Sequence, residues 1–278
     1  MTINNIEKSK KIGKASLFTR LKKSALLERI IWIIIAYTTL LIGWQLLASF
    51  TDVGRFLPGP GTVIVDFIRA FYIPIGEHTL LGHIGWSVGR AMTGFAIGSI
   101  LGVIVGLTMG WYRLGEAIIK PFFEILRPIP PLAWIPISIL WFGIGEESKY
   151  FIIFLASFFA VALNSYSGVR RTDPVLVGAA KMLGASDRQI FFHIALRSTV
   201  PAIFAGLQIS LGASLNAVLA AEMVRSNEGM GWIIIAGSRT FDMEQIFVGL
   251  IAISIVGYSI ITTMRWIEMK LCRWSGVK

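Results

Sequence analysis

Six long apolar runs constrain this chain more than any other feature of its sequence. Each is close to the roughly 20 residues that an α-helix needs to cross the hydrocarbon core of a bilayer. Of the 278 residues, 55% are hydrophobic and only 15% are charged, whereas about a quarter of the residues of a soluble domain are charged. We therefore predict an all-α, polytopic membrane protein with six transmembrane helices, near residues 30–50, 84–110, 117–142, 149–169, 198–221 and 246–266.

The basic residues indicate how these helices are oriented. With the N-terminus inside, the inside segments hold 19 of the 26 Lys and Arg side chains, and the outside segments hold five. Basic loops stay in the cytoplasm, so we predict that both termini are cytoplasmic. The net charge of +10 is then a topology signal and does not indicate nucleic-acid binding. The predicted parts are a basic cytoplasmic N-terminal segment, a transmembrane domain and a cytoplasmic tail, at residues 1–29, 30–272 and 273–278.

Two arginines, Arg90 and Arg127, lie within predicted spans. A cation at the centre of a bilayer costs roughly 2.5–3.5 kcal/mol on insertion scales, so it needs a partner or a wet cavity. We place each near an end of its span and expect its side chain to snorkel to the interface. The alternative is that these two cations attract an anionic substrate.

The third apolar run contains five prolines and must therefore be kinked or broken. Irregular backbone at membrane depth is tolerated where it is buried in protein or lines a cavity. We predict that this segment lines a pathway through the membrane. The candidate pathway residues are Arg127, Pro130, Pro131 and Trp134, together with Asn164 and Asn216 of later spans, which alternatively form interhelical hydrogen bonds.

Glycines recur every four residues along the second run and form one ridge on a helix: Gly94, Gly98, Gly102, Gly106 and Gly110. Such a ridge lets two membrane helices approach closely. We expect tight helix packing here, and a smooth surface along which the helices can slide between two states.

Residues 61–73 are too short to span a bilayer but have an amphipathic pattern. Apolar side chains share one helical face, and Asp66 and Arg69 lie opposite them. This pattern is typical of a helix that lies in the membrane interface.

The polar segment between the fourth and fifth runs has the pattern of two short helices. Asp173-Pro174 begins the first helix, and Gly184 fits the left-handed residue that ends it. Ser186 begins a capping box for the second. The small residues Gly178, Ala179, Ala180 and Ala185 would let this cytoplasmic loop, 172–193, fit deeply into a groove on another protein. The alternative is an amphipathic interfacial loop without a partner.

Several stretches resemble one family. "GAAKMLGASDRQIFFHIALRSTVP" (178–201) resembles the EAA loop of binding-protein-dependent ABC importer permeases. The stretches at 56–64, 127–174 and 206–234 are similar to the subfamily that imports nitrate, bicarbonate, taurine and aliphatic sulfonates. The chain departs from the family pattern twice, because Gly178 replaces the usual Glu and Leu196-Arg197 replaces the usual Leu-Pro.

The resemblance implies a type I ABC importer permease fold in the bacterial cytoplasmic membrane. It implies a homodimer, two ABC ATPase subunits that bind ATP and Mg²⁺, and an extracytoplasmic solute-binding protein. This chain would itself hold no cofactor and would not be an enzyme. The residues implied in coupling to the ATPase are Gly178, Ala179, Ala180, Gly184, Ala185, Ser186 and Phe191.

Two other classes of protein stay open from the residues alone. A secondary transporter or channel would work without an ATPase, and it is expected to show an inverted repeat or paired intramembrane ionisable residues. A membrane enzyme would need a cluster of His, Asp or Glu at one depth, whereas the three histidines lie on both sides of the membrane. The solute also stays open among nitrate, bicarbonate, taurine, alkanesulfonates and small heterocyclic vitamin precursors.

Overall fold

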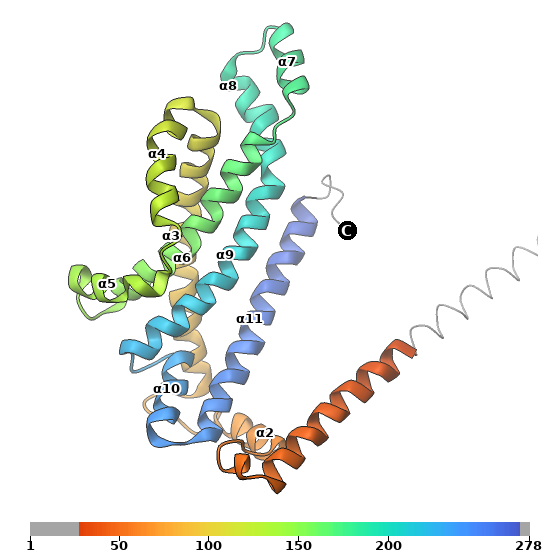
Figure 1. The fold of residues 1–278 in the computed structure, drawn as a ribbon, viewed down its shortest axis with the longest axis vertical. Helices are drawn as coiled ribbons and strands as arrows, with labels where there is room; N and C mark the ends of the chain where they lie inside the picture. The colour runs from red at the N-terminus through yellow and green to blue at the C-terminus, as the bar shows by residue number, and fades with distance from the viewer. Residues whose placement is uncertain (1–27, 273–278) are drawn as a thin grey trace, which may run out of the picture. The chain divides into compact units, whose positions relative to one another are not determined.

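The computed structural model describes residues 28–272 and is helical throughout that range apart from turns and one isolated bridge between Ile75 and His78 (Figure 1). The all-α prediction is therefore confirmed for these residues. Most of the predicted basic segment and the whole predicted tail lie outside them. The chain forms two compact units, and the boundary between them falls after Ile64.

The described part of the first unit contains a helix over Glu28–Phe50, which is 23 residues long and has no buried residue in its most apolar part. A 3₁₀ turn, η1 (Asp52–Arg55), and the start of α2 (Pro60–Arg69) follow. The indole N–H of Trp44 donates to the carbonyl of Pro58 over 3.0 Å, which folds the connection back onto the helix end. The helix predicted from residue 61 is thus present as α2.

The second unit contains the remaining helices. In chain order they are α3 (Leu80–Trp111), α4 (Arg113–Leu126), η2 (Pro131–Trp134), α5 (Ile135–Phe142), α6 (Glu146–Arg170), α7 (Pro174–Met182), α8 (Asp187–Ile190), η3 (Phe191–Ala195), α9 (Leu196–Arg225), α10 (Met230–Thr240) and α11 (Met243–Leu271).

Five helices of the described range are long and apolar enough to cross a membrane, or six when the bent pair formed by α4 and η2–α5 counts as one span. This matches the six predicted runs. The two halves of the bent pair meet at 88°, which confirms the predicted break in the third run. Pro128, Pro130 and Pro131 follow the end of α4, and without their N–H groups the helical hydrogen bonding cannot continue.

Helix α6 packs along α3 on one side and along α9 on the other (Figure 1). The glycine ridge of α3 faces α6. A Cβ on Gly94 would lie 2.6 Å from the side chain of Ile153, and one on Gly102 would lie 2.9 Å from the carbonyl of Phe158. The predicted tight packing is confirmed. Sliding along the ridge stays a prediction.

Helix α10 is an element that the sequence analysis misses, because it treats 222–245 as a connection. Its side chains Met230 and Ile233 are fully buried, and they pack with Leu80 and Val248 of the neighbouring α3 and α11. The end of the bundle opposite the α7–α8 loop is therefore closed by an ordered helix.

Candidate functional site

The loop between α6 and α9 has the predicted local structure. The carboxylate of Asp173 accepts from the N–H of Val175 over 2.8 Å and caps α7. Gly184 has φ +82°, the left-handed conformation expected after a helix end. The Ser186 hydroxyl and the Gln189 side chain form both halves of the capping box that begins α8. The predicted first helix, the glycine turn and the predicted second helix are thus all confirmed, as α7, Gly184 and α8.

The tip of this loop is apolar and exposed. Met182 and Leu183 are 91% and 88% exposed, and Val175 is 73% exposed. A Cβ on Gly178 or Gly184 would meet no atom within 4 Å. Exposed apolar side chains beside small residues are typical of a surface that another protein covers.

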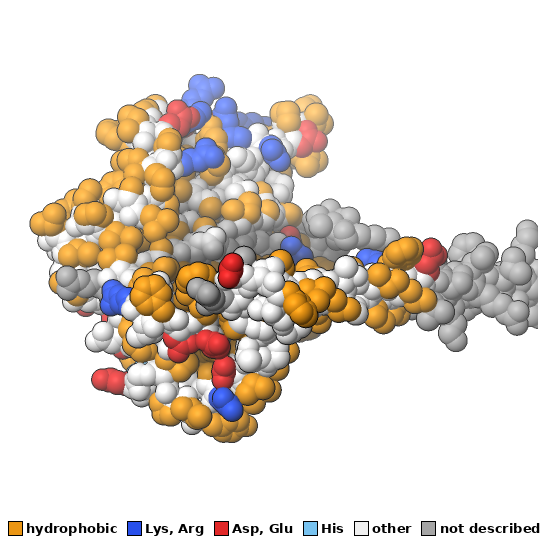
Figure 2. All heavy atoms as spheres, turned by 60° about the horizontal axis from the view of Figure 1, so that its bottom comes forward, with side chains coloured by type: hydrophobic (Ala, Val, Ile, Leu, Met, Phe, Trp, Pro, Cys, Tyr) orange, Lys and Arg blue, Asp and Glu red, His pale blue; other side chains and the backbone are white. Residues whose placement is uncertain are grey.

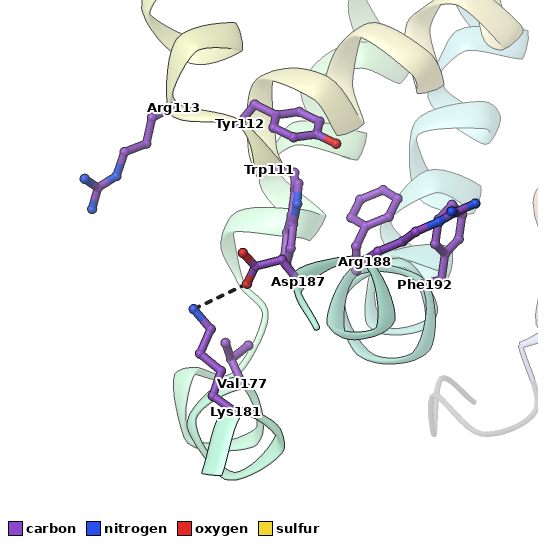
Figure 3. Close-up of a pocket in the computed structure, with 9 residues that line it drawn as sticks. Trp111, Tyr112, Arg113, Val177, Lys181, Asp187, Arg188 and Phe192 are labelled. Atoms are coloured by element: carbon purple, nitrogen blue, oxygen red, sulfur yellow. Dashed lines mark ion pairs between the residues drawn. The ribbon is translucent and has the colours of Figure 1, made fainter. Parts of the chain in front are cut away.

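A pocket of about 730 Å³ separates the loop from the α3–α4 turn (Figure 3). Three basic side chains line it, Arg113, Lys181 and Arg188. The ammonium of Lys181 lies 3.5 Å from the carboxylate of Asp187, so α7 and α8 are linked across the pocket. The remaining walls are Val177 and the aromatic side chains of Trp111, Tyr112, Phe191 and Phe192.

Phe191 connects the loop to the transmembrane helices. Its ring centroid lies 5.1 Å from that of Trp111 at the end of α3. The adjacent Ile190 is fully buried. Packed side chains therefore link α8 and the start of η3 to the end of α3. Ala180, Gly184 and Ala185 line a smaller hollow of about 390 Å³ on the loop itself, and Ala179 is exposed beside it.

A second cavity, of about 520 Å³, lies at the break of the bent span. Four of the six candidate pathway residues line it: Arg127, Pro131, Asn164 and Asn216. They come from the end of α4, from η2, from α6 and from α9. The other walls are apolar: Ile129, Leu132, Leu155, Ala156, Phe159, Ala160, Leu163, Ile209, Ala213 and Ala217.

Trp134 and Pro130 are not among the lining residues. The Trp134 ring packs edge-on against Phe151, with centroids 6.4 Å apart. In this chain, Trp134 is thus placed in the packing of η2 against α6. The side-chain amide of Asn164 donates to the carbonyl of Ala160 over 2.8 Å, four residues earlier in the same helix.

Arg90 does not snorkel, and that prediction is wrong. Its side chain is 1% exposed and lies at the centre of an ion cluster. Nε and Nη2 donate to the two carboxylate oxygens of Glu146 over 2.6 and 2.8 Å. Nη1 donates to the carboxylate of Glu222 over 2.9 Å. The carboxylate and the carbonyl of Glu228 accept the remaining two hydrogen bonds, over 2.7 and 2.9 Å.

The cluster joins three spans and the connection to α10, at the end opposite the α7–α8 loop. Glu222 is fully buried and also accepts from the Ser87 hydroxyl and from the N–H of Gly231. Lys149 donates to Glu146 over 2.8 Å and to the Ser226 hydroxyl over 3.1 Å. Two cations and three carboxylates therefore hold the ends of α3, α6 and α9 together. The sequence held a signal for this cluster, because Glu146, Glu222 and Glu228 all fall in segments that are predicted to lie on the same side of the membrane.

Comparison with known proteins identifies the family. The family model described as a binding-protein-dependent transport system inner membrane component matches residues 98–271. A probable ABC transporter permease of Brucella melitensis is 37% identical over 232 residues, which cover 84% of this chain and 92% of that protein. The taurine transport system permease of Escherichia coli is 32% identical over 240 residues, covering 85% and 87%. The nitrate import permease of Synechocystis is 32% identical over 228 residues, covering 80% and 82%.

Among solved structures, the chain is similar to the inward-facing MetNI methionine ABC transporter, with a TM-score of 0.58 and 19% identity over 68% of this chain and 94% of that chain. This likeness shows the fold and confirms the predicted permease fold. The family match covers more than half of the sequence and includes the bent span, the α7–α8 loop and α9–α11. The chain therefore belongs to the family of inner membrane components of binding-protein-dependent transport systems, which are the permease subunits of ABC transporters.

Proposed function

We propose that two copies of this chain form the translocation pathway of an ATP-driven importer for a small anionic solute. The α7–α8 loop is the observation that carries the proposal. Its tip exposes Met182, Leu183 and Val175 and presents a glycine-broken helix pair with space around Gly178. Relatives named for taurine and nitrate transport support the solute class.

In this proposal, residues 178–191 dock on an ABC ATPase subunit, which binds ATP and Mg²⁺ and carries out hydrolysis. An extracytoplasmic binding protein delivers the solute to the opposite end. Closure of the two ATPases moves both loops, and the contact between Phe191 and Trp111 passes the motion to α3. The pathway then changes between outward-open and inward-open states.

We place both termini and the α7–α8 loop in the cytoplasm. The distribution of Lys and Arg supports this orientation through the positive-inside rule. Figure 2, in which the end opposite the loop is turned forward, shows Asp and Glu side chains gathered on that end and Lys and Arg mainly at the far end. The ion cluster of Arg90 then lies at the extracytoplasmic end of the bundle.

Two substitutions that add the same side chain test the docking element. Gly184→Glu puts a Cβ at φ +82°, which costs about 1–2 kcal/mol in backbone strain, and it adds a charge to the buried contact. Gly178→Glu adds that charge without strain, because its Cβ position is open, and it restores the residue usual in the family.

Gly184→Glu should reach the membrane at normal abundance, lose ATP-driven uptake and copurify poorly with the ATPase. Gly178→Glu should keep both uptake and the ATPase. Membrane abundance, uptake into cells and copurification are measured on both variants. Normal uptake by Gly184→Glu with its ATPase still bound would show that the loop is not the docking element.

A further inference from the structure

Arg127 is a cation whose side chain has no partner among the described residues, and it lies at the break of the bent span. Within the described residues its guanidinium makes no ion pair and no hydrogen bond, and the side chain is exposed and lines the cavity of the bent span. It directly follows α4, whose 14 residues correspond to about 21 Å of helix measured from the α3–α4 turn. The nearest charged residue along α4 is Glu124, three residues earlier, and no ion pair joins it to Arg127. A lone guanidinium there requires water or an anion.

Arg90 provides the contrast within the same bundle. It is 1% exposed, and carboxylate or carbonyl oxygens accept all of its N–H groups. Arg90 therefore has no capacity left for a solute. Arg127 keeps its whole planar fork of five donors, which matches the geometry of a carboxylate or sulfonate oxygen pair.

The rest of the cavity is unlike a site for an inorganic anion. Its volume of about 520 Å³ is lined by eleven apolar residues, whereas the polar side chains are those of Arg127, Asn164 and Asn216. Pockets of roughly 300–1,000 Å³ with apolar walls and a few polar groups bind small organic molecules. The cation and the apolar walls of α6 and α9 together fit a molecule with one charged end.

We propose that this cavity is a binding site for an organic anion in transit, with the oxyanion on Arg127 and the apolar body against Leu155, Phe159 and Ile209. Asn216, on α9, supplies an amide that can hydrogen-bond the same head group. The proposal rests on the proposed function as a permease for anions. It adds a residue-level site within the membrane, and it favours an anion with an apolar chain over nitrate or bicarbonate.

The test uses the complete permease–ATPase complex in detergent, and the probes are sodium hexanesulfonate, sodium methanesulfonate, sodium nitrate and 1-hexanol. Binding is measured by titration calorimetry, and the melting temperature of the ligand-free complex is recorded for every variant. Hexanesulfonate should bind more tightly than methanesulfonate, because each buried CH₂ contributes about 0.8 kcal/mol. Nitrate lacks the alkyl chain and hexanol lacks the negative charge, so both should bind more weakly than hexanesulfonate.

Arg127→Gln should weaken hexanesulfonate binding about 10- to 100-fold, the loss expected for hydrogen bonds to a charged group. Its melting temperature should not change, since Arg127 has no partner to lose. Arg127→Lys keeps the positive charge but loses the planar set of donors, so it should bind hexanesulfonate with an affinity between those of wild type and Arg127→Gln. The matched control is Arg265→Gln, which removes an exposed arginine of α11 outside the cavity and should bind as the wild type does.

Equal affinity of Arg127→Gln and wild type for hexanesulfonate would overturn the proposed site, and so would the absence of binding to the wild-type complex. Equal affinity of wild type for methanesulfonate and hexanesulfonate would overturn the role of the apolar walls. Failure of the proposed function gives a different result from failure of the proposed site, because the chain would then not copurify with an ATPase at all.

Discussion

Replacing Arg90 by methionine should be among the most destabilising single changes in this permease. The guanidinium uses all of its N–H groups in hydrogen bonds of 2.6 to 2.9 Å. Methionine has a comparable length, and it leaves an apolar side chain among three carboxylates. The ends of α3, α6 and α9 would lose the cation that holds them together.

The magnitude follows from how each carboxylate is placed once the cation is gone. Glu146 keeps Lys149 at 2.8 Å, and Glu228 is 22% exposed and can be hydrated. Glu222 is fully buried and keeps only Ser87 and the N–H of Gly231. Removing one partner of a buried ion pair costs about 3–5 kcal/mol, which corresponds to a roughly 10²- to 10⁴-fold lower ratio of folded to unfolded protein.

The free energy of unfolding is measured by titrating the full-length chain in mixed micelles with a denaturing detergent. Arg69→Met is the control, because Arg69 also pairs with a carboxylate, over 3.2 Å, but its side chain is 65% exposed. An exposed pair contributes about 0–1 kcal/mol. If Arg90→Met cost no more than Arg69→Met, the cluster would not stabilise the bundle. Adding Glu222→Gln to Arg90→Met should recover part of the loss, since the uncompensated buried charge is then removed.

Two further predictions concern the topology and the glycine ridge. A cysteine at Glu147 should react with a membrane-impermeant maleimide added outside intact cells and one at Asp187 should not, and reversed labelling would contradict the assigned orientation. Gly98→Ala should lower the melting temperature by an overpacking cost of about 1–3 kcal/mol, because its Cβ would lie 2.7 Å from a main-chain oxygen of α6. Gly89→Ala, on the same helix with no atom within 4 Å of its Cβ, should not lower the melting temperature and should raise it slightly, because alanine favours the helix; equal losses in the two variants would refute the close approach.

Local features were predictable because a few neighbouring residues determine them. The capping box at Ser186 needs only Gln189, three residues later. The left-handed turn at Gly184 needs only a glycine after a helix end. The break after α4 follows from prolines adjacent in sequence. For each of these, the sequence pattern and the observed structure agree.

Features that depend on packing between distant segments were less predictable. Helix α10 has a short apolar pattern that does not distinguish a helix from a connection, and it is ordered because Met230 and Ile233 are buried against α3 and α11. Trp134 adjoins the cavity segment in sequence, but its ring packs on Phe151 of α6. Adjacency to a break therefore predicts a cavity without predicting which side chains enter it.

Arg90 and Arg127 also show that contacts between distant segments decide the surroundings of a charged side chain within a span. In the sequence each is a single basic residue in an apolar run, and the cost of placing it in lipid is the same. The partners of Arg90 lie 56, 132 and 138 residues away, so its burial is decided only when three helix ends meet. Arg127 forms no ion pair with a described residue, and most of the side chains around the cavity beside it are apolar. An arginine whose charge the protein itself neutralises serves the fold, whereas one whose charge is left open is available to a passing anion. Which of these an arginine becomes is set by where the carboxylates of other helices lie, and the three carboxylates of Arg90 all come from segments that the sequence predicts on one side of the membrane.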